Sequence, residues 1–245
     1  CLRGADSADA MPRREGDRPL RRQRENEEWG TATAMHLPDG YLDARVWLPL
    51  TVAAGAATAP CLASLDRPES ARALPRLGMT AAYLFAAQMI NFPVFPGVSG
   101  HLLGGALAAI LLGPAAATVV IACVLSVQTL FFQDGGLTAL GANQFNMGIV
   151  GAWGGYAVYR ATAGLGPSVA AALAAWVAVM LGALAMAIEL ALSGVAEAAP
   201  LLRTMLAIHA VIGLGEAALT AAAVGVFSIV HSPIDTLEIN VGGTE

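Results

Sequence analysis

The sequence predicts an all-α polytopic membrane protein, folded as a compact bundle of about seven transmembrane helices. Of its 245 residues, 56% are hydrophobic and only 13% are charged, whereas a soluble domain carries about 25% charged residues. The mean hydropathy is +0.63. The third observation is a series of apolar runs, most of them close to the roughly 20 residues that a spanning helix needs. The net charge of −5 gives no electrostatic basis for binding nucleic acid.

Seven apolar runs account for the predicted helices, and Gly, Pro and polar residues separate them. The third run is short, and Gly113-Pro114 follows it as a helix stop and a helix start. We therefore expect it to form a half-helix or a short tilted span, and six spans are the alternative to seven. In chain order the runs cover residues 46–64, 77–95, 101–112, 115–132, 144–161, 167–193 and 204–231.

Composition also divides the chain into three parts. Residues 1–34 form a polar leader with seven Arg and seven acidic residues and no apolar run. We expect this leader to be absent from the mature protein or disordered, and a regulatory or targeting tail is the alternative. The membrane-embedded domain then covers 35–231, and 232–245 form a short cytoplasmic tail.

Arginines orient the predicted helices. Arg67, Arg72 and Arg76 follow the first apolar run, and the positive-inside rule assigns them to the cytoplasm. Alternating the helices from this point puts the segment around His36 and the loop 93–101 on the outer side. Two histidines, His36 and His101, are therefore expected on the same face of the membrane.

The pair Met35-His36 offers a metal chelate if Met35 is the working N-terminus. Its amine, the His36 amide nitrogen and the His36 imidazole can close two fused chelate rings, and such nitrogens in a plane suit Ni(II), Cu(II) or low-spin Co(II). Pro38 has no amide proton, so the fourth ligand must come from elsewhere. His101 is the candidate, because it shares the outer face and follows a loop rich in Gly and Pro. The alternatives are chance surface histidines and, for His101, a role in packing or at a helix start.

Three ionisable residues lie inside the last two predicted helices. His209 and Glu216 are seven residues apart and share a helix face, and Glu189 lies in the preceding helix. An ionisable group within the membrane is a functional hypothesis by default. Interhelical pairing, docking of a partner, direct metal ligation and a proton relay remain open for these three residues.

Further polar residues near the predicted outer loops are candidates to orient the metal ligands through hydrogen bonds. The alternative is that they cap helix ends and hold the loop backbone in place. The candidates are Asn91, Ser99, Asn143 and Asn146.

Four stretches, MHLPDGYLD, NFPVFPGVSGHLLGGALAAILLGP, DGGLTALGANQFNMGIVG and HAVIGLGEAALT, resemble the CbiM/NikM family. Its members are the substrate-binding membrane (S) components of energy-coupling-factor transporters for cobalt and nickel. The resemblance covers 35–231. It implies a near-planar nitrogen site whose ligands are the terminal amine of Met35, the amide and imidazole of His36, and the imidazole of His101. A retained leader would remove the terminal amine from this set.

The resemblance also implies the setting in which the chain works. The protein would be a transporter subunit without a cofactor, supplying Co(II) or Ni(II), for example to cobalamin biosynthesis. Its partners would be a transmembrane coupling (T) subunit, two cytoplasmic ATPase subunits and, as an option, a small accessory membrane subunit. Its location would be the inner membrane of a bacterium or archaeon, with the metal site facing outside.

The chain itself has no Walker A sequence for ATP hydrolysis. An ion-coupled secondary metal transporter that uses Glu189, His209 and Glu216 is the alternative function. A membrane-embedded metalloenzyme is a third, although no catalytic metal triad is visible in the sequence.

Overall fold

The computed structural model describes residues 36–65, 74–90, 92–95 and 98–231. These residues are helical apart from connecting segments and one short strand pair. Several parts of the sequence-based prediction fall outside the described residues: the leader 1–34, Met35, Arg67, Arg72, Asn91 and the tail 232–245.

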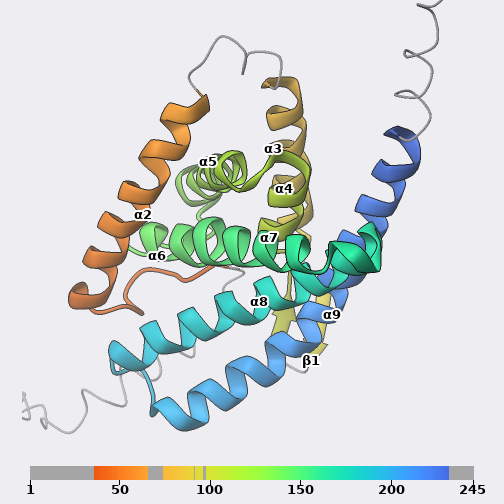
Figure 1. The fold of residues 1–245 in the computed structure, drawn as a ribbon. Coiled ribbons are helices and arrows are strands. Elements are labelled where there is room, and N and C mark those ends of the chain that lie inside the picture. Colours follow the sequence, from red (N-terminus) through yellow and green to blue (C-terminus); the bar gives the residue numbers. More distant parts are fainter. Residues whose placement is uncertain (1–35, 66–73, 91, 96–97, 232–245) are drawn as a thin grey trace, which may run out of the picture. The chain divides into compact units, whose positions relative to one another are not determined.

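The helices follow the predicted apolar runs in order (Figure 1). Because α6, η2 and α7 join without a break, the described residues form seven helical segments and one additional short 3₁₀ turn, η3. The predicted all-α fold is thus confirmed. The bounds are α2 Ala44–Leu65, α3 Leu74–Gln88, α4 Gly105–Leu112, α5 Pro114–Phe132, α6 Leu140–Gln144, η2 Phe145–Gly151, α7 Ala152–Ala161, η3 Ala163–Leu165, α8 Pro167–Leu192 and α9 Ala198–His231.

Four of the described helices are long and apolar enough to cross a membrane: α2, α5, α8 and α9, the last over Ala198–Ser228. Two of them, α8 and α9, run antiparallel side by side (Figure 1). Alanines of α8 form much of the buried surface of this helix, including Ala171, Ala174 and Ala175. Such small side chains let helix backbones approach closely, which is how helices associate in lipid.

The predicted run 77–95 does not remain helical to its end. Helix α3 stops at Gln88, and the chain continues as strand β1, Phe92–Phe95, paired antiparallel with β2, Val98–Gly100. Pro93 explains the change, because proline disfavours the α conformation of the preceding residue and has no N–H for a helical hydrogen bond.

The third run forms a short helix, as expected. With eight residues, α4 is about 12 Å long and cannot span the hydrocarbon core alone. Glycines delimit it at both ends: Gly104 has φ +75° and Gly113 has φ +84°. A side chain at Gly104 would also collide with Leu84, so glycine is needed there on two counts.

The predicted run 144–161 contains a local change of helix type. Residues Phe145–Gly151 are π-helical between α6 and α7, and such segments are rare and concentrate at functional sites. Helix α4 packs against this segment so closely that a Cβ on Gly105 would lie 2.7 Å from the Met147 carbonyl oxygen. The main chain of the π-helical turn therefore packs directly against the main chain of α4 at Gly105.

Connecting segments that are distant in the sequence meet at one end of the helices. The Asp43 amide donates to the Ser193 hydroxyl at 3.1 Å, and the Gly136 amide donates to the Leu37 carbonyl at 2.8 Å. These bonds agree with the alternating up-and-down course of the chain.

Candidate metal centre

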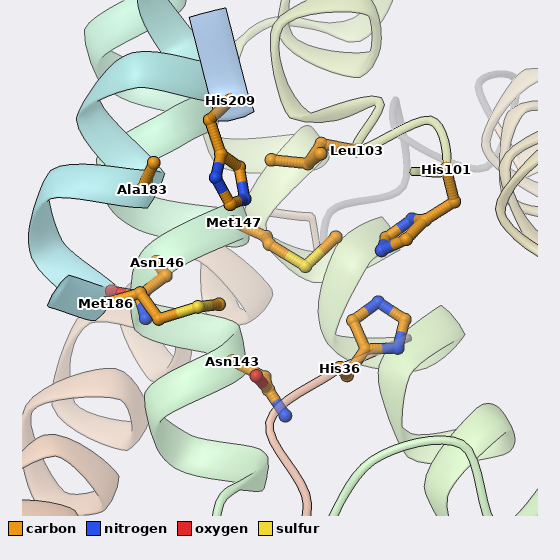
Figure 2. A pocket seen from close by; sticks show the side chains of 10 residues that line it. His36, His101, Leu103, Asn143, Asn146, Met147, Ala183, Met186 and His209 are labelled. Atoms are coloured by element: carbon orange, nitrogen blue, oxygen red, sulfur yellow. The ribbon is translucent and has the colours of Figure 1, made fainter. Parts of the chain in front are cut away.

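A cavity of about 60 Å³ lies among the segment that begins at His36, the segment 101–104, the α6–η2 helix, α8 and α9 (Figure 2). A single water molecule needs roughly 10–15 Å³ measured in this way, so the cavity has room for a small ion with its ligands. Three of the chain's four histidines line it. The complete lining is His36, His101, Leu103, Asn143, Asn146, Met147, Gly182, Ala183, Met186 and His209.

His36 and His101 meet at the edge of this cavity, although 65 positions separate them in the sequence. Their ring centroids are 5.0 Å apart, with an angle of 62° between the ring planes, and Figure 2 shows the two rings next to each other. His36 is only 5% exposed. Neither of its ring nitrogens has a hydrogen-bond partner among the described residues, and its Nδ1 lies 3.4 Å from Oδ1 of Asp134. Leaving a buried polar atom without a hydrogen bond costs folding free energy. A metal ion bound to the His36 imidazole would offset this cost.

Asn143 holds the residue next to His36 in place. Its side-chain oxygen accepts from the Leu37 amide at 3.1 Å, and its amide group donates to the Leu37 carbonyl at 3.2 Å. Asn143 was predicted to orient the ligands, and it lies against the main chain beside His36. The loop at Gly135 and Gly136 packs on the same segment, where a Cβ would collide with His36 or Asp39.

Asp39 also holds the segment that follows His36, through hydrogen bonds to the loop at 137–138. One carboxylate oxygen accepts from the Thr138 amide at 2.7 Å and from the Thr138 hydroxyl, and the other accepts from the Leu137 amide at 3.1 Å. Burial acts to raise the pKa of Asp39, but these hydrogen bonds to Thr138 and Leu137 lower it below its ordinary value. The carboxylate form is therefore favoured, and the clasp to 137–138 depends on it.

His101 does not begin a helix, contrary to the prediction. It lies in the irregular segment 101–104 between β2 and α4, because the left-handed conformation of Gly104 prevents α4 from starting earlier. Its Nδ1 donates to the Leu102 carbonyl at 2.9 Å. The proton on Nδ1 leaves Nε2 as the basic nitrogen, and histidine ligands in metal sites typically use their second nitrogen in this way.

The main chain after His101 is bonded from two sides. Both carboxylate oxygens of Glu216 in α9 accept main-chain hydrogen bonds of 2.7 Å, from Leu103 and from Gly104. The side-chain amide of Gln88 in α3 donates to the Leu103 carbonyl at 2.8 Å. Gln128 in turn donates to the Gln88 side-chain oxygen at 3.0 Å.

The other polar residues predicted inside the helices also have defined partners. Asn146 donates to Glu189 at 2.9 Å, and Nδ1 of His209 donates to the Met205 carbonyl at 2.8 Å. Among the described residues, no hydrogen bond or ion pair joins Glu189, His209 and Glu216 to one another. Each contacts a different part of the bundle.

Ser99 is the remaining predicted site residue in the described chain. Its main chain lies in β2, opposite Pro93. Asn91 and Met35 lie outside the described residues.

The side chains of His, Cys, Asp and Glu do not form a metal site of three or more such groups anywhere in the described residues. A metal ion bound by the imidazoles of His36 and His101 would therefore need further donors to complete its coordination sphere. A main-chain chelate at Met35-His36 is one source of such donors. The thioethers of Met147 and Met186, which also line the cavity, would favour softer metal ions.

Comparison with known proteins gives an independent view of the chain. Residues 36–233 match the family model CbiM, described as the cobalt uptake substrate-specific transmembrane region. The chain is 42% identical over 198 residues to a putative fused nickel transport protein NikMN of Archaeoglobus fulgidus, a match that covers 78% of this chain and 64% of that protein. It is 39% identical over 193 residues to a putative metal transport protein of Haloquadratum walsbyi, covering 76% and 87% of the two chains. The chain thus spans less than two thirds of the fused Archaeoglobus protein.

Two crystal structures share the fold. One, a transition metal transporter, has a TM-score of 0.77 and 28% identity and covers 85% of this chain and all of its own. The other, a truncated transition metal transporter, has a TM-score of 0.71 and 30% identity, covering 81% of this chain and 99% of its own.

Proposed function

The chain belongs to the CbiM family of cobalt uptake substrate-specific transmembrane regions, and from this premise we propose that it is the substrate-capture membrane subunit of an ATP-driven energy-coupling-factor importer for Co(II) or Ni(II). Relatives named for nickel transport and for cobalt transport support both cargoes. Metal affinity alone does not decide between the two ions.

The observation that carries the proposal is the meeting of His36 and His101 at a buried cavity, with ring centroids 5.0 Å apart. Hydrogen bonds fix the main chain next to His36 and the ring of His101. Asn143 bonds to the main chain of Leu37, and the Leu102 carbonyl accepts from the His101 ring. Imidazole nitrogens bind borderline transition-metal ions such as Ni(II) and Co(II).

The proposed ligands are the Met35 amine, the His36 amide and imidazole nitrogens, and the His101 imidazole. A chelate ring that includes the His36 amide closes through Nδ1, the nitrogen that lies 3.4 Å from Asp134. Metal binding would exchange this contact for a metal bond and leave the Asp134 carboxylate beside a cation, where its charge is favourable. The ligand set requires a native chain whose first residue is Met35.

The proposed assembly contains a transmembrane coupling subunit, two cytoplasmic ATPase subunits and, as an option, a small accessory membrane subunit. The relatives called fused NikMN proteins support the presence of a further component, since this chain spans 64% of one of them and 36% of another. ATP hydrolysis would occur on the partner subunits. We place the protein in the cytoplasmic membrane as a multi-pass subunit whose metal site opens to the outside.

The alternative is an ion-coupled secondary transporter with Glu189, His209 and Glu216 as a proton relay. The structure favours it less, because these residues bond to Asn146, Met205 and the main chain of 103–104 rather than to one another. Metal uptake that survives inactivation of the ATPase subunits but collapses with the proton gradient would establish this alternative.

The test of the metal site is the binding of Ni(II) and Co(II) to His36→Ala and His101→Ala proteins. Each substitution removes a ligand, so we expect tight binding to be lost, by more than the roughly 10- to 100-fold that the hydrogen-bond partners of ligands contribute. One extra residue before Met35 should be about as harmful, and intact mass should give Met35 as the first residue of the native protein.

The matched control is His231→Ala. His231 ends α9, 22 residues beyond His209, which corresponds to about 33 Å along the helix axis. This variant should bind metal as the wild type does. Full affinity in either His36→Ala or His101→Ala would refute the assignment.

A further inference from the structure

The segment that carries His101 has no regular structure of its own. Residues 101–104 lie between β2 and α4, outside any helix or strand, and the Gly104 carbonyl accepts from the Ala108 amide of α4 at 2.9 Å. A metal ligand must be held within about 0.5 Å of its productive position, and sites on loops are less well fixed than sites on helices. The stability of the His101 position must therefore come from residues elsewhere in the chain.

Glu216 is the strongest contact to this segment. Its two carboxylate oxygens accept from two successive amides, those of Leu103 and Gly104, each at 2.7 Å. The residue is 3% exposed and lies inside a helix proposed to span the membrane, where an ionisable group is retained only when it is well bonded or functional. Two charge-assisted hydrogen bonds to main chain are among the stronger contacts that a carboxylate can make.

Gln88 and Gln128 complete the support from the opposite side. The Gln88 amide donates to the Leu103 carbonyl, so both main-chain groups of Leu103 are bonded to side chains. Gln128 donates to the oxygen of Gln88. Both glutamines are fully buried, and together with Glu216 they connect α3, α5 and α9 to a single residue, two positions after His101.

The ring of His101 is linked directly to this supported main chain. Its Nδ1 donates to the Leu102 carbonyl, which belongs to the peptide unit whose amide is the Leu103 N–H bonded by Glu216. A shift of that peptide plane moves both the hydrogen-bond acceptor of His101 and the Glu216 contact. The direction of the His101 ring therefore depends on the position of Glu216.

We propose that Glu216 is a positioning residue for the transported metal ion: by holding the peptide units at 102–104 it sets the direction of the His101 imidazole, and Gln88 supports the same peptide from α3. The inference rests on the proposed function, in which His101 is a metal ligand. It assigns Glu216 to the geometry of the metal site instead of to a proton relay.

The experiment measures Ni(II) binding to the purified protein with its native N-terminus, by titration and by the visible absorption of the bound metal ion. The variants are Glu216→Gln, Gln88→Met, His101→Ala and the double variant His101→Ala with Glu216→Gln. In Glu216→Gln, an NH₂ group faces one of the two amide donors, so one hydrogen bond is lost. Thr220→Val is the control, because Thr220 is equally buried, lies one turn along α9 and has no hydrogen-bond partner for its hydroxyl among the described residues.

We expect Glu216→Gln to weaken Ni(II) binding by about 10- to 100-fold and to change the absorption spectrum, because the His101 nitrogen leaves its position in the ligand plane. Gln88→Met should change both in the same direction and by less, whereas Thr220→Val should match the wild type. In the double variant, Glu216→Gln should cause no further loss beyond that of His101→Ala, since two residues acting through one ligand are not additive.

Three results would overturn the inference while leaving the proposed function intact. They are wild-type affinity and spectrum in both Glu216→Gln and Gln88→Met, weaker binding with an unchanged spectrum, and additive losses in the double variant. Wild-type affinity in His101→Ala alone would instead refute the proposed function, and the inference with it.

Discussion

At the scale of single residues, two of the three histidines that line the cavity share one arrangement. His101 and His209 each donate Nδ1–H to a main-chain carbonyl, from Leu102 and Met205 respectively. In each ring, Nε2 is therefore the nitrogen that can bind a metal ion or a proton. His36 differs, because its Nδ1 lies beside Asp134 and neither nitrogen is hydrogen bonded within the described residues. The ring that would close the chelate is thus the least constrained by hydrogen bonds of the three.

Asp39 gives a prediction at the residue scale. Its hydrogen bonds to 137–138 lower its pKa, so they stabilise the fold fully above its ordinary pKa of about 3.9 and lose that effect as the pH falls through the lower, folded value. Asp39→Asn removes this titration and loses an acceptor. We expect the wild-type unfolding temperature to drop more steeply below about pH 4 than that of Asp39→Asn, as measured by thermal unfolding in detergent.

The same variant should release metal faster at neutral pH, because the segment that carries His36 loses a clasp. This effect differs from the weaker metal binding expected at mildly acidic pH, which arises from protonation of the ligand nitrogens. If the unfolding temperatures of the wild type and Asp39→Asn fall equally steeply below about pH 4, the hydrogen bonds of Asp39 do not stabilise the fold in this way.

Several residues that the sequence predicted for the metal site line one cavity. They are His36, His101, Asn143 and Asn146. The sequence predicted no role for Asp39 or Gln88, because their hydrogen bonds join main chain 98 and 15 positions away. The cavity methionines carried no separate signal, since thioether side chains in an apolar run resemble ordinary core residues.

At the scale of helices and strands, hydrophobic runs predicted the number and order of the helices but not their local form. The π-helical turn at 145–151 has no periodic signature in a sequence that is apolar on most sides. The strand pair after α3 could have been anticipated from Pro93. The start of α4 was placed too early because the left-handed conformation of Gly104 is a property of the folded chain.

The close packing of α4 on the π-helical turn gives a prediction at this scale. A methyl group at Gly105 would lie 2.7 Å from the Met147 carbonyl oxygen and 3.3 Å from the Ala152 amide nitrogen. Because neither backbone atom can turn aside, Gly105→Ala should destabilise the protein by roughly 1–3 kcal/mol and weaken metal binding by displacing Met147 from the cavity.

The control is Gly78→Ala in α3. Its new methyl group meets no atom within 4 Å, so its effect on stability should range from neutral to a gain of about 1 kcal/mol, as expected from helix propensity. Equal unfolding temperatures and equal Ni(II) affinities for the Gly105 and Gly78 variants would contradict the proposed role of this contact.

At the scale of the whole molecule, the contacts between connecting segments explain how residues distant in the sequence form one centre. Alternating the helices from the arginine-rich loop predicts that the segment around His36 and the loops 93–101, 133–136 and 194–203 share one side of the membrane. In the described residues, 36–43 contacts His101 and Gly136 in two of these loops, and Ser193 next to the third. Helix alternation alone could predict this common end, but the pairing of particular residues across it depends on loop geometry that no local pattern encodes.

The orientation of that common end in the membrane decides whether the centre can capture metal from outside, and it is testable with two single cysteines. Val195 lies in the loop between α8 and α9 at the end that carries His36, and Leu165 lies between α7 and α8 at the opposite end. Both side chains are exposed, at 46% and 59%. If the positive-inside assignment is correct, a membrane-impermeant maleimide added to intact cells should label Val195→Cys, whereas Leu165→Cys should react only after the membrane is opened. The unsubstituted protein, whose sequence contains Cys1, Cys61 and Cys123, sets the background. Labelling in the reverse order would put the histidine centre on the cytoplasmic side, and a site in that position would face metal after its passage through the membrane instead of before it.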